Sequence, residues 1–466
     1  MFTLKRMRNS PNVFPILVII LASILGCSDT MDSRFQSLSK QVTEKVIMTD
    51  PCVITSKSDV LIDFSTEATN DWFDDVHDYQ SKLDKMNSEG LRPAETIQFE
   101  ILRDYLNRSL LRDSFRFHNY PISHLFGPHL DYPKRFNHKA ANSKIEIEDY
   151  LDELQKIEGL FGALIEGLEH RRKNGIILPT FILNQVIDQC DSLSSLPLAA
   201  NPFYLNFESK LNAIDLLEPN LKAEFLSECK ATVSKSIIPA YKRLTAYLRQ
   251  LELRSVSVAG VWQLPNGDEF YRFTLFYYSG AENNPSNLHE IAKVQLSTIE
   301  GELQILSTLT TRPSKAQFPV PADTSSRLLY FPTFERGLTL YTQHTELATS
   351  TEVTPENQIG FLQLDQLATA KMMVDIGIHH KQWLREQAVR FLLNHSSLSE
   401  PQANAEVDRI VVYPGLQSSA KIGLMKLIEL QGNKTEKDFL EELEKLGPMP
   451  LKTLQKWLPE KQESAS

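Results

Sequence analysis

The feature that most constrains the fold of this chain is a helical hydrophobic period that recurs along most of its length. Residues 145–175 place apolar side chains every three or four positions and end in Lys, Arg and Gly, as is typical of an amphipathic helix and its C-terminus. The same period recurs at 96–115, 179–190, 236–254, 358–377, 379–394, 402–411 and 418–430. Because no internal repeat or interior low-complexity segment separates these stretches, we predict a mainly α protein with one large helical domain over residues 41–466.

One segment departs from this period. In GVWQLPNGDEFYRFTLFYYSG, residues 260–280, a Pro-Asn-Gly turn separates two runs rich in aromatic residues and Val. This arrangement is typical of a β-hairpin, so the sequence predicts a small hairpin or edge sheet here. A helix is expected to follow, with Asn284 as its N-cap and Pro285 at its first position.

The charge pattern excludes one class of partner. The 466 residues carry a formal net charge of −10, and no basic or aromatic-interleaved stripe appears among them. A nucleic-acid-binding surface needs such a stripe to neutralise phosphates, so we expect no nucleic-acid partner.

The amino terminus has the pattern of an export signal. Lys5, Arg6 and Arg8 precede an apolar run of about thirteen residues, which is too short to span a bilayer comfortably. The run ends in Ile-Leu-Gly-Cys, which resembles a bacterial lipobox with Cys27 as the lipid-bearing residue. We therefore predict a lipoprotein signal peptide over residues 1–26, a flexible tether over 27–40, and a membrane anchor through the lipid. Ser28 favours the outer membrane, facing the periplasm, over the inner membrane; a plain secretory signal or an uncleaved anchor is the alternative.

Three further cysteines, Cys52, Cys190 and Cys229, follow no metal-binding spacing. An odd number of thiols forms at most one disulfide among themselves. We interpret them as mainly buried small hydrophobic residues, and a single bridge stays open as an alternative in an oxidising compartment.

Histidines gather in two segments. His118, His124, His129 and His138 are interleaved with prolines, and their spacing fits neither a helix face nor a tight turn, so we predict an irregular loop. Asp375, His379, His380 and Trp383 surround Gly377 at an expected helix boundary, where packing and function are both open interpretations.

The stretch NLHEIAKV, residues 287–294, matches the first four of the five positions of the zinc-protease helix motif H-E-x-x-H. That motif presents two imidazoles to one metal ion from a single helix face. Lys293 occupies the place of the second imidazole, and an ammonium group cannot ligate a cation.

Several motifs together resemble a known family. They are NPFY, IIPAYKRLTAYL, LPNGDEFY, NLHEIA, GLTLYTQ, MVDIGIHHKQWLREQAVRFL and YPGLQSSAKIG, and they run in this order between about Asn137 and Trp457. Their order and spacing resemble the bacterial domain of unknown function 885, whose members are often lipoproteins and are treated as zinc-peptidase-like. The resemblance implies a helical fold of the zincin-like peptidase type.

The resemblance also shows what this chain lacks. The family carries a later H-E-x-x-P-G-H-H metal motif, and here no histidine occurs between His289 and His344. Arg336 falls where the family's carboxylate is expected, with Glu335 adjacent. The family's Gln and Tyr near its Pro-Gly motif fall on Leu416 and Ala420. Alanine cannot donate to an oxyanion, and an arginine repels a cation, so these departures each oppose metal-assisted hydrolysis.

We therefore predict a lipid-anchored, catalytically inactive relative of zinc peptidases that needs no cofactor and binds peptides or an envelope protein. Candidate residues of the remnant groove are Tyr341, Asp375, His379 and Trp383. Two alternatives stay open. One is an active metallohydrolase that holds zinc through His289, Glu335 and His379, and the other is a purely structural lipoprotein.

Overall fold

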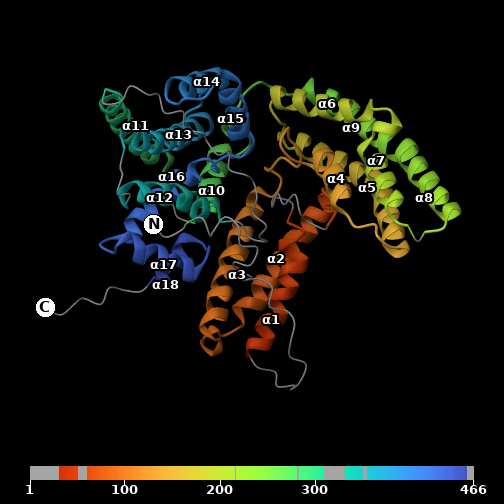
Figure 1. Cartoon of the computed structure of the whole chain (residues 1–466), viewed down its shortest axis with the longest axis horizontal. Helices are drawn as coiled ribbons and strands as arrows, with labels where there is room; N and C mark the ends of the chain where they lie inside the picture. Colours follow the sequence, from red (N-terminus) through yellow and green to blue (C-terminus); the bar gives the residue numbers. More distant parts are fainter. Residues whose placement is uncertain are drawn as a thin grey trace.

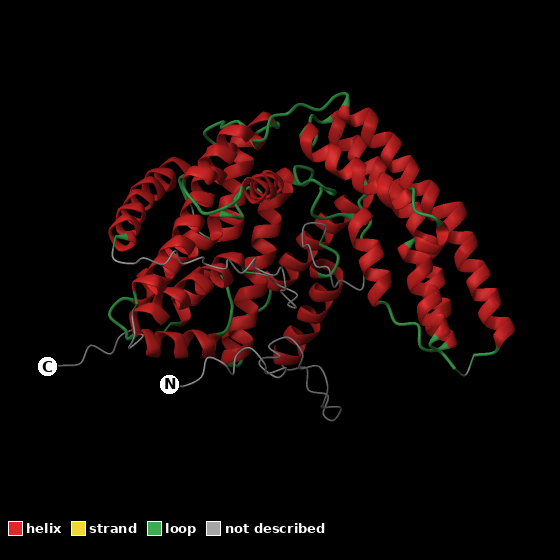
Figure 2. Cartoon of the chain, turned by 45° about the horizontal axis from the view of Figure 1, so that its top comes forward, coloured by secondary structure: helices red, strands yellow, loops and turns green. Residues whose placement is uncertain are grey.

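The computed structural model describes residues 31–50, 60–215, 217–280, 283–308, 331–349 and 354–458. These residues form α-helices with short 3₁₀ and π-helical turns, and they contain no strand (Figure 2). The prediction of a mainly α protein with one helical domain is confirmed. The predicted signal peptide, Cys27 and Cys52 lie outside the described residues.

The first three helices form a small core of their own. They are α1 (Met31–Val42), α2 (Thr66–Asp84) and α3 (Pro93–Arg112), and α1 continues directly into a π-helical turn, Thr43–Ile47. Phe35, Trp72 and Phe99 are among the side chains buried between them. The predicted flexible tether was therefore wrong for residues 31–40. Phe35, Leu38 and Val42 repeat at helical spacing and give this segment an apolar face to bury.

A buried ion pair closes this core at the end of α3. The Arg112 guanidinium donates to both carboxylate oxygens of Asp50, at 2.8 and 3.3 Å, and the Tyr105 hydroxyl donates to the same carboxylate at 2.7 Å. Arg112 and Asp50 are 2% and 1% exposed. The Arg112 guanidinium also lies 4.5 Å from the Trp72 ring centroid. The pair therefore fixes the segment after the π-helical turn to the end of α3.

Six helices follow and pack around the largest hydrophobic core. They are α4 (Pro128–His138), α5 (Lys144–Lys173), α6 (Thr180–Ser194), α7 (Pro202–Asn212), α8 (Pro219–Thr232) and α9 (Ile238–Glu252). The longest of the described helices is α5, which Ser143 caps by accepting from the Glu146 amide. The segment with four histidines is not an irregular loop throughout, because Pro128 starts α4, which contains both His129 and His138.

The remaining helices form a third group. They are α10 (Gly267–Ser279), α11 (Pro285–Ser307), α12 (Pro332–Thr349), α13 (Pro355–His379), α14 (Arg385–Asn394), α15 (Glu400–Val412), α16 (Ser418–Gln431), α17 (Glu436–Leu446) and α18 (Leu451–Trp457). Helix α13 lies near the centre of this group, where it contacts α11, α12, α14, α15 and α16. In α13 every residue from Leu367 to His379 except Lys371 is buried. In Figure 1 helices α10–α18 lie on one side of the molecule and α4–α9 on the other, with α1–α3 below and between them. Among the described helices, none is long and apolar enough to cross a bilayer.

The predicted β-hairpin was wrong. Residues 261–263 form a 3₁₀ turn, and Gly267–Ser279 form α10. Asn266 adopts a left-handed conformation with φ 52° and starts the helix instead of closing a hairpin. Gly267 is required there because an added Cβ would lie 1.9 Å from the Val261 carbonyl oxygen. Phe270, Tyr271, Thr274 and Leu275 then share one buried helix face, so burial of that face outweighed the strand preference of aromatic residues.

Cys190 and Cys229 are buried in the largest core and are not joined to each other or to another described residue. Burial raises the pKa of each thiol to about 12. Both residues fit the interpretation of small hydrophobic side chains.

Candidate functional site

The last turn of α13 carries Asp375, which organises the segment before α16. Its carboxylate accepts hydrogen bonds from the Gly415 amide at 2.9 Å, from the Ser418 amide at 3.1 Å and from the Ser418 hydroxyl at 2.6 Å. Asp375 is fully buried, and burial raises its pKa to about 6 although the hydrogen bonds from Ser418 and Gly415 oppose this rise. Gly415 has φ +81° and leaves no room for a Cβ, which would lie 3.0 Å from the Leu275 amide nitrogen. Asp375 therefore acts as an internal acceptor that shapes the Pro-Gly turn.

His379 lies one helical turn further on and is fully buried. Its Nδ1 accepts from the Val261 amide at 3.2 Å, so its Nε2 carries the proton and donates to the Ile410 carbonyl at 3.0 Å. Burial lowers the pKa of His379 to about 4, which keeps the ring neutral. Both ring nitrogens are thus used by the main chain, and neither has a lone pair free for a metal ion.

This arrangement predicts a pH dependence of stability. The folded pKa of His379 lies below the usual value of 6.5, so between pH 6.5 and 4 the unfolded chain binds a proton that the folded chain does not. Acidification from pH 7 to 5 is therefore expected to cost on the order of 2 kcal/mol through this residue. Asp375 acts in the opposite direction, because its raised pKa favours the folded state as the pH falls from about 6.

Urea unfolding at pH 7 and pH 5 measures the effect. Replacing His379 by Gln removes the titrating group, so the His379→Gln variant is expected to lose less stability between the two pH values than the original protein. Equal losses in the two proteins would contradict the assignment.

Trp383 lies in the segment between α13 and α14 and covers the end of α13. Its amide donates to the Gly377 carbonyl at 2.8 Å. A Cβ added to Gly377 would lie only 2.4 Å from the Trp383 ring, so the ring packs directly on this glycine. The His289 ring meets the Trp383 ring edge-on, with 6.0 Å between centroids. The structure thus brings Asp375, His379, Trp383 and His289 to one end of α13.

The other predicted site residues lie elsewhere. Tyr341 is fully buried in α12 and packs edge-on against Phe439 of α17, at 5.6 Å between ring centroids. Glu335 lies in the first turn of α12, where its Oε1 accepts from the Phe331 amide at 3.4 Å. Its neighbour Arg336 donates to the Gln417 side chain at 3.1 Å.

The three residues of the alternative zinc site do not form one group: His289 and His379 lie at the same end of α13, but Glu335 does not complete a metal-binding set with them. Within the part of the chain that the structure describes, no group of three or more His, Cys, Asp or Glu side chains is placed to hold a metal ion. The four histidines at 118–138 also separate: His118 contacts the Pro265 carbonyl at 2.7 Å, and His129 contacts the Gln189 side chain at 2.9 Å. None of these sets forms a metal site.

Two residues that sequence reasoning missed join His380 in a hydrogen-bonded chain. His380 Nδ1 lies 2.7 Å from Asp268 Oδ1, and His380 Nε2 lies 3.0 Å from Ser286 Oγ. Asp268 is in the first turn of α10 and Ser286 in the first turn of α11. The hairpin prediction missed Asp268, because it placed this residue beside a turn between strands and not in the first turn of a helix.

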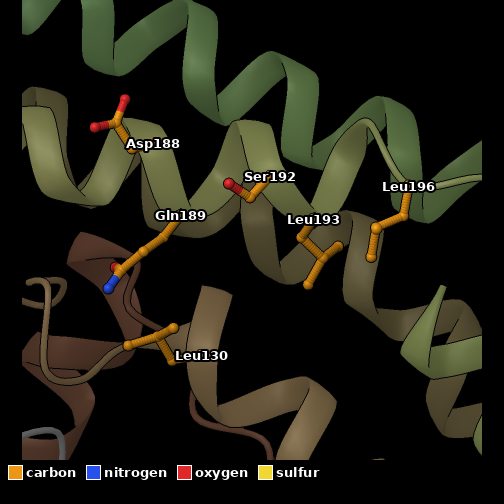
Figure 3. A pocket seen from close by; sticks show the side chains of 6 residues that line it. All are labelled: Leu130, Asp188, Gln189, Ser192, Leu193 and Leu196. Atoms are coloured by element: carbon orange, nitrogen blue, oxygen red, sulfur yellow. The ribbon is translucent and has the colours of Figure 1, made fainter. Parts of the chain in front are cut away.

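A shallow depression with a volume of about 440 Å³ lies between α4 and α6 (Figure 3). Leu130, Leu193 and Leu196 make most of its wall, and Asp188, Gln189 and Ser192 complete it. None of the predicted site residues lines it. Gln189 is already engaged, since its side chain also donates to the His124 carbonyl at 2.9 Å.

The fold and site define a class of protein: a helical domain with buried polar contacts at the end of a central helix, without an assembled metal site in its described residues. Residues 52–316 and 316–458 match the family described as bacterial protein of unknown function (DUF885), and the chain belongs to this family. A search among curated proteins found no match.

Two solved structures are similar to this chain. One is a candidate lipoprotein from Colwellia psychrerythraea, with 16% identity and a TM-score of 0.74 over 92% of this chain and 98% of the other. The second is a candidate lipoprotein of unknown function from Shewanella oneidensis, with 13% identity and a TM-score of 0.70 over 93% of this chain and 100% of the other. At these identities the likeness shows the fold.

Proposed function

We propose that this chain is a lipid-anchored protein of the cell envelope that binds peptides or a protein partner and does not hydrolyse them with zinc. The anchor rests on the lipobox-like Ile-Leu-Gly-Cys27 sequence and agrees with the description of both similar structures as candidate lipoproteins. Outer-membrane attachment facing the periplasm follows from Ser28 after the modified cysteine.

The main observation in support of a loss of zinc chemistry is that both ring nitrogens of His379 are hydrogen-bonded to the main chain. A metal ligand needs a nitrogen lone pair, and both ring nitrogens of His379 are committed to Val261 and Ile410. Leu416 and Ala420 stand where the family's Gln and Tyr are expected, and Leu416 is buried. An oxyanion donor is therefore lacking at these positions as well.

The surface that supports binding lies around Trp383. Its indole is half-buried, the next residue Leu384 is 63% exposed, and Lys381 is exposed two residues earlier. Aromatic side chains that pack against other residues of their own protein are frequent anchors of peptide interfaces. A nearby ammonium group attracts a peptide carboxylate. Here Gly377, His289 and Phe391 support the indole.

Metal analysis and a binding assay on the purified mature protein test this proposal. We expect no stoichiometric zinc, no cleavage of a mixed peptide library, and a thermal shift with a subset of those peptides. Trp383→Ala is expected to weaken binding about tenfold, a change of about 1.4 kcal/mol. Leu253→Ala, at a residue 86% exposed after α9, serves as the matched control and should bind normally.

Two results would replace this proposal by its alternatives. Stoichiometric zinc together with peptide cleavage that a chelator abolishes would identify an active metallohydrolase. Absence of zinc, cleavage and binding together would identify a purely structural lipoprotein.

A further inference from the structure

Three helix ends meet around the imidazole of His380. His380 is the C-cap residue of α13, Asp268 is the second residue of α10, and Ser286 is the second residue of α11. The imidazole lies between the carboxylate and the hydroxyl, at 2.7 and 3.0 Å. A serine, a histidine and an aspartate far apart in the sequence therefore form one continuous hydrogen-bonded chain.

The chemistry of the partners fixes the proton positions along this chain. An ionised carboxylate only accepts, so His380 Nδ1 donates its proton to Asp268. Nε2 of the neutral ring then has a free lone pair and accepts the proton of the Ser286 hydroxyl. This is the order of groups that activates a serine: nucleophile, base, and a carboxylate that orients the base.

Asp268 is held in the ionised form that this role needs. Its second oxygen accepts from Arg272 Nε at 3.0 Å. Burial raises the pKa of Asp268, but the hydrogen bonds from His380 and Arg272 outweigh burial and leave the pKa below its usual range. The carboxylate thus orients the His380 ring through its contact with Nδ1.

The Ser286 hydroxyl is not needed for helix capping. The Asn284 side chain already accepts from the Ser286 amide at 2.9 Å and from the Asn287 amide at 3.2 Å, which caps α11. The hydroxyl is instead directed to His380. Lys381 Nζ donates to the same oxygen at 3.4 Å and places a positive charge beside it.

The three groups differ in their exposure to solvent. The His380 side chain is 15% exposed and the Asp268 side chain 50% exposed, while Ser286 is half-buried. The base is thus largely removed from water, and the carboxylate side of the chain reaches the surface.

We propose that Ser286 is a nucleophile that hydrolyses carboxylic esters, with His380 as its general base and Asp268 as the positioning residue. Ser286 Oγ forms a bond to the ester carbonyl carbon while its proton moves to His380 Nε2. The carbon–oxygen bond to the alcohol then breaks, and the alcohol leaves with that proton. Water attacks the acyl-serine by the same proton transfers and releases the acid. The reaction needs no metal ion or cofactor.

An ester suits the site better than an amide. Among the described residues, two side chains lie within hydrogen-bond reach of Ser286 Oγ: those of His380 and Lys381. The Lys381 ammonium group is therefore the cation available to stabilise the developing oxyanion. Less stabilisation of that charge favours substrates with a more reactive carbonyl and a better leaving group. An ester carbonyl is less stabilised by resonance than an amide carbonyl, and an alkoxide is a better leaving group than an amide anion.

A fluorophosphonate probe on the purified mature protein tests the proposal. The serine oxygen would displace fluoride from phosphorus, and peptide mass spectrometry would place the modification on Ser286. Ser286→Ala should abolish labelling, and His380→Gln should slow it at least a hundredfold, the usual contribution of a general base. Asp268→Asn should slow labelling, whereas Asp268→Glu, which keeps the carboxylate, should restore part of the rate. Hydrolysis of p-nitrophenyl acetate should follow the same order and should be unaffected by a chelator.

Ser143→Ala is the matched control, since Ser143 also stands at a helix N-terminus but its hydroxyl accepts from the Glu146 amide as an N-cap. It should label at the rate of the original protein. Circular dichroism melts of all variants separate a chemical loss from a failure to fold. Absence of labelling in the folded original protein, labelling at another serine, or unchanged labelling in His380→Gln would overturn the proposal. Each outcome is independent of the zinc and peptide measurements above.

Discussion

Replacing Arg112 by Met is expected to lower the free energy of unfolding by about 3 to 5 kcal/mol. The substitution keeps most of the side-chain volume but leaves the Asp50 carboxylate, 1% exposed, without the guanidinium that neutralises it. An uncompensated charge in the interior costs far more than the intact pair contributes. Urea unfolding followed by circular dichroism measures the loss.

Two further variants make this test specific. The double variant Arg112→Met with Asp50→Asn removes both charges and is expected to recover much of the loss. Arg103→Met, at an exposed position on the same helix, should change stability by less than about 0.5 kcal/mol. A loss in Arg112→Met no larger than in Arg103→Met would show that the ion pair does not hold the N-terminal helices together.

Replacing Asp375 by Ala is expected to cost about 3 to 5 kcal/mol at pH 7.5, because three buried donors lose their acceptor together. Asp375→Asn keeps one acceptor oxygen and should cost less. The loss should concentrate at the start of α16, so hydrogen exchange of the Ser418 amide should accelerate in the Ala variant beyond the change in global stability. Unchanged exchange at Ser418 would contradict the acceptor role of Asp375.

The sequence predicted helices well where an apolar face repeats over many turns. Residues 145–175 are α5 almost to the residue, and the predicted cap Asn284 and first-turn Pro285 of α11 are confirmed. Long-range burial is not needed for such predictions, since the helix period and the capping residues are local. The predicted boundary at residues 377–379 was close, with α13 ending at His379 and α14 beginning at Arg385.

The errors arose where local preference and tertiary burial disagree. The Pro-Asn-Gly turn at 265–267 favours a hairpin, yet the close approach of Gly267 to Val261 and the buried face of α10 select a helix. The three prolines and four histidines of residues 117–138 favour a loop, yet Pro128 starts α4. In both cases proline and glycine mark a helix start, which has the same residue preferences as a turn.

The candidate site could be predicted only in part. The sequence pointed to Asp375, His379 and Trp383 as a group because they share one helix end, and the structure places them together. Neither Ser286 nor Asp268 has a local signal, since each is an ordinary polar residue in a helical first turn. Their roles depend on how α10, α11 and α13 meet, which a sequence period does not encode.

The burial of Cys190 and Cys229 has a consequence for their reactivity. With thiol pKa values of about 12, almost no thiolate forms at neutral pH, and attack on a disulfide requires the thiolate. Once folded, these two residues would therefore not react with the oxidants and isomerases of a secretory compartment. Oxidation of the two sulfurs would thus be confined to the time before the chain folds.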